Sequence, residues 1–428
     1  MNLNVKHFIF SGHDTIDLAN KYGTPLYVLS EDIIRENIVH IENAFRKSKL
    51  DYQIIYAGKA LLNTAVCRIL KDTSLYLDVV SGGELYTAIK ASFPMEKIFF
   101  HGNNKSMDEL VLAIESGVGR IVVDNIQELE LLNRICIEKN TRADILFRIT
   151  PGVGAHTHKY IQTGQEDSKF GIPIFLVEDV IERALKMKGV NVKGIHCHIG
   201  SQILDSRPYE NVTEIMLSLI KKLNQNDNII ISELNLGGGF GISYSSETPP
   251  LNMDQLIAKL TNYIKLKTKE FNIPLPKIFI EPGRYITGNA GITLYEVGTI
   301  KEIANIRKYV SVNGGMTDNP RTALYGAKYK AYIANKMDIE DRETVSIAGR
   351  CCESGDMLIW DISLPPCESG DILAILDTGA YNYSMSSNYN RFPKPPMVLL
   401  KGKQSEIIVK GETYEDITRN DRIPSWLL

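Results

Sequence analysis

The sequence predicts an α/β protein in which a (β/α)8, TIM-type barrel is followed by an antiparallel β domain. Short apolar segments alternate with helical patterns from about residue 30 to residue 285. Eight of these segments are typical of strands, and eight is the number that closes such a barrel. After Arg284 the pattern changes to short β-branched segments separated by Gly, Pro or Asp, which is typical of antiparallel sheet. An open, doubly wound sheet is the alternative for the first part.

The barrel prediction follows from strand segments that alternate with amphipathic helices, since this order implies right-handed βαβ units and a parallel sheet. The first helix is expected to begin after Ser30, a candidate N-cap, because isoleucines recur at helical spacing from Ile34 to Ile41. Further helical patterns cover Ser106–Gly117 and Asn125–Lys139. The expected barrel strands are Asp51–Ala57, Leu75–Val80, Lys97–His101, Arg120–Asp124, Ala143–Thr150, Val190–His196, Ser232–Leu236 and Lys277–Glu281.

The β domain is expected to include both ends of the chain. Residues 1–29 lack the barrel pattern and are assigned to it together with residues 286–428, which leaves residues 30–285 for the barrel. No low-complexity linker separates the two parts. The expected β-domain strands include Thr293–Ile300, Thr344–Ala348, Asp371–Leu376 and Glu406–Val409.

The composition excludes several classes of protein. The 428 residues carry a formal net charge of -3, so no basic excess supports a nucleic-acid or anionic-membrane partner. No apolar segment is long enough to span a bilayer, and the N-terminal residues do not resemble a signal peptide. Six dispersed cysteines without a C-x-x-C pair are typical of reduced thiols, which favours the cytoplasm.

The segment Gly194–Gln202 carries two imidazoles, a thiol, a hydroxyl and an amide at the end of an expected strand. Polar groups at the carboxyl end of a parallel strand face a ligand pocket in barrels of this class, although a pair of buried core histidines is the alternative. The run Gly237–Gly241 follows the seventh strand. Its glycines would let backbone N–H groups approach a phosphate, but a plain turn also explains them. The run is not G-x-G-x-x-G, so a dinucleotide site is not indicated.

Two further strand ends carry candidate chemical groups. Lys59 follows the first strand between small residues, where partial desolvation would make its amine a Schiff-base nucleophile; taken by itself, a surface lysine is the favoured interpretation. Asp78 ends the second strand, ahead of Ser81 and Glu84, which we interpret as a capping box. The segment from His101 ends the third strand and also places polar groups in a loop.

The last barrel strand ends in Glu281-Pro-Gly-Arg284, which can direct a carboxylate and a guanidinium at one ligand, or form a local ion pair. The Arg suits a phosphate or carboxylate, and the Glu suits a protonated ring nitrogen. Cys351 and Cys352 are adjacent, which is unlike the spaced pairs of zinc sites and favours a thiol acid, or simply a buried turn.

A metal site is the less favoured interpretation of the histidines. His156 with His158, or His196 with His198, could supply zinc ligands, but the first pair opens a basic, glycine-spaced loop without a matching acidic shell. A lysine, a glycine-rich phosphate cradle, a Glu near an Arg, an imidazole and a thiol together fit pyridoxal 5'-phosphate as the cofactor instead, with no metal.

The motifs also resemble a known family. In their type and order they are similar to those of the fold-type III pyridoxal-phosphate decarboxylases, which have an alanine racemase-like fold, and within them the diaminopimelate decarboxylase family. The matching segments cover nearly the whole chain: Tyr56–Lys59, Asp78–Glu84, His101–Lys105, His156–Gly171, His196–Gln202, Gly237–Gly239, Glu281–Arg284, Gly314–Met316, Arg321–Tyr325, Cys352–Asp356 and Gly379–Tyr381.

The resemblance implies a role for each matching residue. Lys59 would carry the cofactor as a Schiff base, His198 would stack on its ring, and Glu281 would keep the ring nitrogen protonated. Cys352 would be the proton donor, reaching the active site of a neighbouring subunit across a homodimer interface. The implied cofactor-binding residues also include Asp78, Ser201, Gly238, Gly239, Gly283, Arg284 and Tyr381. The implied substrate-binding residues are Arg284, Arg321, Tyr325, Glu353 and Tyr381.

The family implies decarboxylation of a small amino acid, meso-2,6-diaminopimelate, to L-lysine and CO2. Its alternative is a branch that decarboxylates a glutamyl unit tethered to an acyl carrier protein, giving a 4-aminobutanoyl carrier in butirosin-type aminoglycoside antibiotic biosynthesis. An acidic carrier would dock on a basic surface, for which Lys259–Lys269 is a candidate, although a solvated helix face is the simpler interpretation. A binding regulator without activity, or a zinc hydrolase, is less favoured because Lys59, Cys352 and Arg284 are all present.

Three positions differ from the pattern usual in the family. Asn63 lies further from the lysine than usual, Asn313 stands where Asp is common, and Thr322 replaces a common Pro. None of them removes a catalytic group.

Overall fold

The computed structural model describes residues 6–152, 168–226, 229–244 and 249–428. The chain divides into two compact units. The barrel unit comprises Asn37–Ser243 and Pro249–Ile286, and the β unit comprises Met1–Glu36, Tyr244–Thr248 and Thr287–Leu428. Each unit has its own sheet and its own core.

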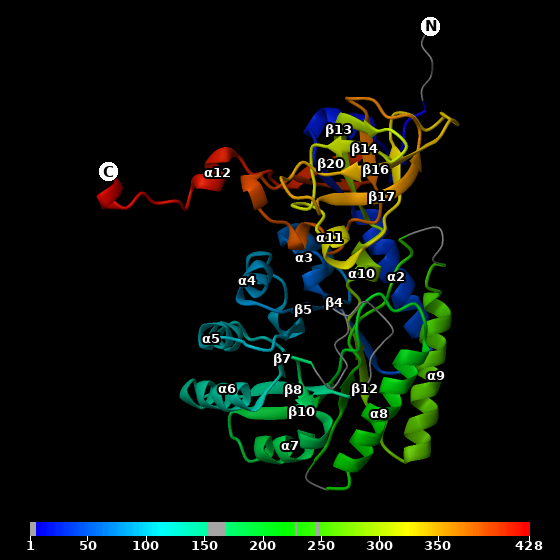
Figure 1. Ribbon diagram of the computed structural model, residues 1–428. Helices are drawn as coiled ribbons and strands as arrows, with labels where there is room; N and C mark the ends of the chain where they lie inside the picture. Colours follow the sequence, from blue (N-terminus) through cyan, green and yellow to red (C-terminus); the bar gives the residue numbers. More distant parts are fainter. Residues whose placement is uncertain (1–5, 153–167, 227–228, 245–248) are drawn as a thin grey trace. The chain divides into compact units, whose positions relative to one another are not determined.

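The barrel unit contains a closed sheet of parallel strands (Figure 1). Its strands pair in the order in which they follow along the chain, and β10 pairs with β8 on one side and β11 on the other. Pairing of β12 with β4 completes the ring, so the alternative of an open sheet is wrong. A short extra strand, β9 (Ile172–Pro173), pairs with β8. The barrel strands are β4 (Tyr52–Ala57), β5 (Tyr76–Val79), β6 (Ile98–Phe100), β7 (Arg120–Val123), β8 (Ala143–Thr150), β10 (Val190–His196), β11 (Glu233–Asn235) and β12 (Lys277–Ile280).

Helices connect successive strands and lie outside them in Figure 1. They are α3 (Thr64–Lys71), α4 (Gly82–Lys90), α5 (Met107–Ser116), α6 (Ile126–Glu138), α7 (Val177–Leu185), α8 (Arg207–Leu223) and α9 (Met253–Phe271). Helix α2 (Glu31–Arg46) precedes the first barrel strand, and the short α10 (Arg284–Thr287) follows the last. A buried apolar cluster from five strands fills the barrel, as expected for this fold: Ile55, Phe99, Val122, Leu146 and Phe279.

Side-chain caps set the starts of the helices, because the first backbone N–H groups of a helix lack partners within it. Ser30 Oγ accepts a hydrogen bond from the Ile33 N–H at 3.2 Å, as its sequence position predicts. Ser106 begins α5 with a complete capping box. The predicted box at Ser81 is only half formed: Ser81 accepts from the Glu84 N–H, but the Glu84 carboxylate accepts from Val80.

The β unit is built around the long strand β13 (Gly291–Ile303). The N-terminal strand β3 (Leu26–Ser30) pairs antiparallel with it, so the start of the chain joins this sheet. Most pairings are antiparallel, as predicted, but β14 with β16 and β19 with β3 are parallel. The other strands are β1 (Ile9–Phe10), β2 (His13–Asp14), β14 (Arg307–Val312), β15 (Ala331–Ile333), β16 (Glu343–Ala348), β17 (Met357–Leu364), β18 (Ile372–Ile375), β19 (Met397–Lys401) and β20 (Gln404–Val409). Its helices are α1 (Thr15–Tyr22), α11 (Arg321–Tyr325) and α12 (Tyr414–Thr418).

The three unusual positions have structural contacts of their own. Asn63 caps α3 by accepting from the Val66 N–H at 2.9 Å. Asn313 donates to the Thr24 hydroxyl at 2.8 Å, and Thr322 donates to the Leu358 carbonyl at 2.8 Å. These side chains therefore stabilise turns and strand contacts. Within the described ranges, no helix is both long enough and apolar enough to cross a membrane.

Candidate active site at the ends of the barrel strands

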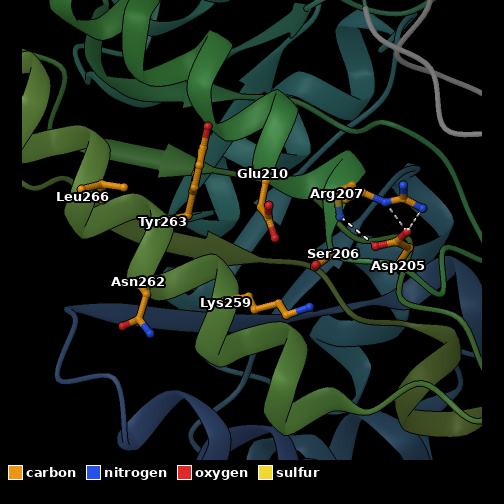
Figure 2. A pocket seen from close by; sticks show the side chains of 8 residues that line it. All are labelled: Asp205, Ser206, Arg207, Glu210, Lys259, Asn262, Tyr263 and Leu266. Atoms are coloured by element: carbon orange, nitrogen blue, oxygen red, sulfur yellow. Dashed lines mark hydrogen bonds and ion pairs between the residues drawn. The ribbon is translucent and has the colours of Figure 1, made fainter.

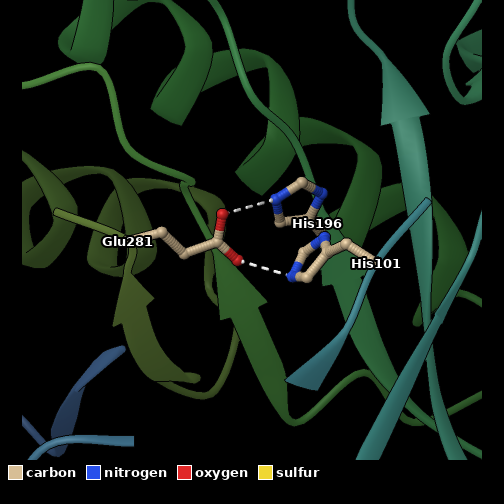
Figure 3. Close-up of side chains that lie close together, drawn as sticks. All are labelled: His101, His196 and Glu281. Carbon is tan, nitrogen blue, oxygen red and sulfur yellow. Dashed lines mark hydrogen bonds and ion pairs between the residues drawn. The ribbon is translucent and has the colours of Figure 1, made fainter. Parts of the chain in front are cut away.

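Glu281, directly after β12, lies at the centre of a buried polar cluster (Figure 3). Its Oε1 accepts a hydrogen bond from the Asn235 amide at 2.7 Å and lies 2.9 Å from His101 Nε2. Its Oε2 lies 3.2 Å from His196 Nε2. The two imidazole rings meet edge to face, with their centroids 4.8 Å apart. Three strand ends thus bring their polar side chains to one carboxylate.

The pKa values of the two histidines of this cluster are shifted in opposite directions. Burial disfavours the charged form of both rings. At His101 the nearby carboxylates of Asp78 and Glu281 outweigh burial and raise the pKa. At His196 burial dominates and lowers the pKa to about 4, so this ring is neutral near pH 7. The two imidazoles hold the pKa of Glu281 well below its usual range despite its burial.

Asp78, on β5, adds a second buried carboxylate to the cluster. Its Oδ1 lies 3.9 Å from His101 Nε2, beyond a hydrogen bond. Burial raises its pKa to about 6, opposed by the positive charge of His101. Asp78 therefore acts on the cluster through charge.

A glycine loop after β11 lies beside His198 and Ser201. The Gly238 N–H donates to His198 Nδ1 at 3.1 Å, which makes this nitrogen an acceptor. Burial, and then the positive charge of Lys59, holds the pKa of His198 well below its ordinary value, so the ring is neutral. Arg284 donates from Nη2 to the Ser201 hydroxyl at 2.9 Å. The neutral imidazole of His198 thus lies against the glycine loop, and the guanidinium of Arg284 lies against Ser201.

The close packing of this loop requires glycine. A Cβ on Gly238 would lie 2.2 Å from the Glu281 carbonyl oxygen, and one on Gly239 would lie 2.5 Å from that of Gly200. Gly239 also has φ +104°, which L side chains rarely adopt. Among the described residues, none accepts the Gly239 N–H. A glycine loop with an available N–H next to a buried Arg284 fits a phosphate group.

Lys59 lies on the single turn Gly58–Ala60 that follows β4. Its side chain is exposed, in keeping with the surface lysine that its sequence context alone favours. The neighbouring Gly283 allows the turn and the end of β12 to approach, because a Cβ there would lie 3.0 Å from that of Ala60. The Lys59 charge acts on Asp78 and His198, so its amine belongs to the same group of side chains. An accessible amine beside a phosphate cradle fits an aldehyde-bearing phosphate cofactor.

The structure bears on the metal alternative at three points. His156 and His158 lie outside the described residues. His196 contacts Glu281 while His198 contacts Gly238, so this pair is not directed at one point. His101, His196 and Glu281 are close enough to hold a metal ion, but their contacts with one another and with Asn235 already account for their arrangement.

Two buried ion pairs near the strand ends were not predicted. Lys105 donates to Glu128 Oε1 at 2.7 Å and to the carbonyls of Gly102 and Val122. Arg148 lies 4.0 Å from Asp124. In sequence each of these residues looks like an ordinary charged residue beside a helix or strand, and only the closed barrel brings the partners together. His101 and Asn235 had a weak signal, since both stand where expected strands end.

The β unit holds the second group of predicted residues. Arg321, at the start of α11, is buried and donates to the Tyr329 hydroxyl at 2.7 Å. Its guanidinium also lies 4.9 Å from the centre of the Tyr244 ring. Tyr325 ends α11, and Tyr381 has φ 64° beside Asn382, which lies 3.4 Å from the Tyr329 hydroxyl. Nothing in the sequence singles out Tyr244 or Tyr329 among 20 tyrosines.

The two adjacent cysteines differ in exposure. Cys351 is buried, and burial, then the Asp356 carboxylate, raises its pKa to about 12. Cys352 and Glu353 are exposed. Asp356 fixes the loop by accepting from the backbone N–H groups of Cys351 at 2.7 Å and Met316 at 2.6 Å. The Cys352 N–H donates to Asn390 at 2.7 Å, so an exposed thiol is held on an ordered loop.

A barrel whose strand ends carry a glycine loop, a buried arginine and an accessible lysine fits an enzyme that uses a phosphate-bearing aldehyde cofactor. Residues 32–288 match the family described as pyridoxal-dependent decarboxylase, pyridoxal binding domain. The chain belongs to this family of decarboxylases, and pyridoxal phosphate is its cofactor.

Within these enzymes the chain belongs to the diaminopimelate decarboxylase family. It is 48% identical over 417 residues to the diaminopimelate decarboxylase of Bacillus subtilis, covering 97% of this chain and 95% of that protein. The enzyme of Bacillus methanolicus is 49% identical over 94% of each chain. The crystal structure of diaminopimelate decarboxylase from M. jannaschii superposes with a TM-score of 0.93 at 39% identity, covering 99% of this chain and 97% of that one. A second structure of that enzyme is a complex with L-lysine.

Proposed function

We propose that this decarboxylase converts meso-2,6-diaminopimelate to L-lysine and CO2. The observation that carries the proposal is the 45–49% identity to diaminopimelate decarboxylases over at least 94% of the chain. The L-lysine complex of the M. jannaschii enzyme supports it, since L-lysine is the product of this reaction.

The barrel unit is proposed to hold the cofactor. Lys59 would bind it covalently through Nζ, and the neutral ring of His198 would lie against its ring. Ser201, Gly238, Gly239, Gly283 and Arg284 would surround its phosphate, and Tyr381 would add a hydroxyl from the β unit. Glu281 would accept from the ring N–H, with Asp78 as a further negative charge. When bound, the cofactor supplies an electron sink for the pair left by the departing carboxylate.

The β unit is proposed to supply the substrate-binding groups and the acid. Arg321 is buried with its charge held by aromatic neighbours, which suits binding of a substrate carboxylate. Tyr325, Glu353 and Tyr381 would contribute further polar contacts, and Arg284 of the barrel unit is also proposed to bind the substrate. Cys352 Sγ would donate a proton to the carbon that has lost its carboxylate. An exposed thiol on a loop fixed by Asp356 supports this role, because substrate can reach it.

We also propose that the enzyme is a homodimer in which Cys352 serves the partner's active site. The exposed position of Cys352 supports this, and so does the C-terminal segment from Thr413 to Leu428, which exposes several large apolar side chains. Asp421 of this segment accepts a hydrogen bond from the Arg391 guanidinium at 2.6 Å. The exposed large side chains of the segment are Tyr414, Ile423, Trp426, Leu427 and Leu428. Exposed apolar side chains grouped on one segment are typical of a contact surface.

Mixing two inactive variants tests the shared active site. Lys59→Ala and Cys352→Ala each lack one group in every site. If sites are shared, exchanging subunits between them creates one site with both groups, and activity returns. No recovery in subunits shown by light scattering to have exchanged would contradict the proposal.

The cytoplasm is the proposed location. All six cysteines are free in the structure, and five of them are buried. Thiols that are not paired are typical of a reducing compartment.

The tethered-glutamate alternative receives less support from the surface. Among the lysines proposed for carrier docking, Lys267 pairs with Glu214 at 2.8 Å and Lys265 donates to the Ser48 carbonyl. A cavity of about 540 Å³ beside Lys259, between α8 and α9, has mixed charge (Figure 2). There Arg207 pairs with Asp205 at 2.5 Å. Such a surface lacks the basic excess that an acidic carrier would need.

CO2 release by the cofactor-loaded enzyme tests the substrate. We expect turnover of free meso-diaminopimelate and none of glutamyl-loaded acyl carrier protein, with Lys59→Ala as the inactive control. Turnover of the tethered glutamate alone would replace the proposal with the alternative. Release from neither, with cofactor bound, would overturn both substrate assignments.

A further inference from the structure

His101 contacts Glu281 in the barrel unit and has no part in the function proposed above. It follows β6 and is 4% exposed, and its Nε2 lies 2.9 Å from Glu281 Oε1. An isolated carboxylate this deeply buried would take up a proton, because burial disfavours its charged form. Something in the cluster must therefore keep Glu281 ionised.

The neighbours of Glu281 contribute unequally to its charge. Asn235 is neutral, and His196 is neutral near pH 7 because burial lowers its pKa to about 4. His101 differs because it lies between two carboxylates, Asp78 at 3.9 Å and Glu281 at 2.9 Å, and these raise its pKa. The other positive groups acting on these carboxylates are Lys59 and Arg148. The imidazole of His101 is the one in direct contact.

The contacts also leave room at the carboxylate for a ligand. An ionised carboxylate has about four acceptor positions. The Asn235 amide donates to Oε1, with His101 Nε2 in ion-pair contact with the same oxygen, and His196 occupies one position on Oε2. Within the described ranges, one position on Oε2 remains. A ring N–H directed at it would be the fourth donor.

We propose that His101 is a positioning residue: as an imidazolium it keeps Glu281 ionised, so that Glu281 in turn keeps the ring nitrogen of the cofactor protonated. This inference rests on the proposed role of Glu281 toward that nitrogen. It assigns the two histidines different tasks. His101 supplies charge, while His196 supplies only a neutral N–H and is replaceable by another neutral donor.

The test compares His101→Asn with His196→Asn, because asparagine offers an N–H donor of similar reach without a charge. Each variant is loaded with pyridoxal phosphate that carries ¹⁵N in the ring, and solid-state ¹⁵N NMR reports whether this nitrogen is protonated at pH 8. We expect a protonated ring in the wild type and in His196→Asn, and an unprotonated ring in His101→Asn. The dissociation constant of the cofactor should rise about tenfold in His101→Asn and by less than about threefold in His196→Asn.

The variant Glu281→Gln, studied without substrate, distinguishes the proposed role of Glu281 toward the ring nitrogen from the proposed role of His101 toward Glu281. If the ring stays protonated in Glu281→Gln, the proposed role of Glu281 fails, and the role of His101 fails with it. If Glu281→Gln loses the ring proton but His101→Asn keeps it, only the role of His101 is overturned. The double variant should bind cofactor no more weakly than Glu281→Gln alone, because His101 acts through that carboxylate.

A structural role would give a different pattern. Circular dichroism of each cofactor-free variant reports folding, and His101→Gln replaces His101→Asn should the latter not fold. A loss of thermal stability with a protonated ring in the folded variant would make His101 a packing residue and overturn the proposal.

Discussion

The Glu281 cluster of the barrel unit and the Cys352 loop of the β unit differ in how they hold the side chains proposed to act in catalysis: the first is buried and the second is exposed. Glu281 is 6% exposed and His196 1%, and every charge there lies near a compensating charge. Cys352 is exposed, and its loop is fixed by a hydrogen bond from the Cys351 N–H to the buried Asp356 carboxylate. Groups that set the electronic state of a cofactor benefit from a dry and rigid environment, where electrostatic interactions are strong. A group that delivers a proton has to be reached.

The largest expected effect comes from Lys59, which is exposed like Cys352 but lies in the barrel unit. Lys59→Ala should lower kcat/KM for diaminopimelate by more than about a thousandfold, because the covalent attachment is lost. Its stability should stay within about 0.5 kcal/mol of the wild type, since the side chain is exposed. The measurements are CO2 release and urea unfolding.

Lys59→Arg is the matched control for charge. It keeps a positive charge near His198 but does not offer the same nucleophile. Activity of this variant near the wild-type level would show that Lys59 acts by charge alone.

Breaking the buried Lys105–Glu128 ion pair should lower the stability of the protein and not affect the catalytic chemistry directly. Lys105→Met leaves Glu128 as an unpaired buried charge and should lower the free energy of unfolding by about 3–4 kcal/mol. Urea unfolding of the cofactor-free protein measures the change.

A surface pair on the same unit serves as the control. Lys139 lies 2.6 Å from Glu115, but both side chains are partly or largely exposed, so Lys139→Met should cost less than about 1 kcal/mol. Equal losses at the two sites would contradict the distinction between buried and exposed ion pairs.

Cys352→Ala should show the reverse pattern, with activity lost and stability kept. We expect kcat to fall about a hundredfold, the lower end of what general acids contribute, with unfolding unchanged within about 0.5 kcal/mol. Single-turnover CO2 release and product formation, followed separately, distinguish loss of the proton donor from loss of decarboxylation.

The neighbouring Cys351→Ala sharpens the comparison. Its thiol is buried with a pKa raised to about 12, so its loss should cost about 1 kcal/mol of stability and leave kcat within a few fold. If Cys351→Ala were the slower variant, the thiol assignment would be reversed.

The last prediction concerns a stability effect that depends on pH, at Glu84, whose pKa burial raises from 4.5 to about 7. Since the folded value exceeds the unfolded one, protonated Glu84 stabilises the fold below about pH 4, and this contribution is lost as the pH rises through 7. Glu84→Gln keeps an acceptor for Val80 and should be more stable than the wild type by about 2 kcal/mol at pH 8.5, with no gain at pH 4. Urea unfolding at both pH values measures this; a gain independent of pH would point to packing instead.

Much of the barrel site was predictable because its residues stand at strand ends. In a parallel barrel every strand end arrives at the same rim, so Glu281, His198 and the glycine run could be grouped from strand counting alone. Lys59 could be placed in the same way, and its exposure matches the surface lysine that its local sequence favours. Periodicity likewise predicted the helices that begin after Ser106 and Asn125, because their caps are local.

By itself, the sequence determined the βα order, the antiparallel character of the last part and the chemistry-bearing motifs, because these depend on residues close together in the chain. The tertiary structure alone decided which pairs meet: β10 with both β8 and β11, Lys105 with Glu128, and His101 with Glu281 across 180 positions. It also decided that Cys351 is buried while Cys352 is exposed. Such contacts depend on ring closure and on burial, and both are properties of the folded chain that no local pattern encodes.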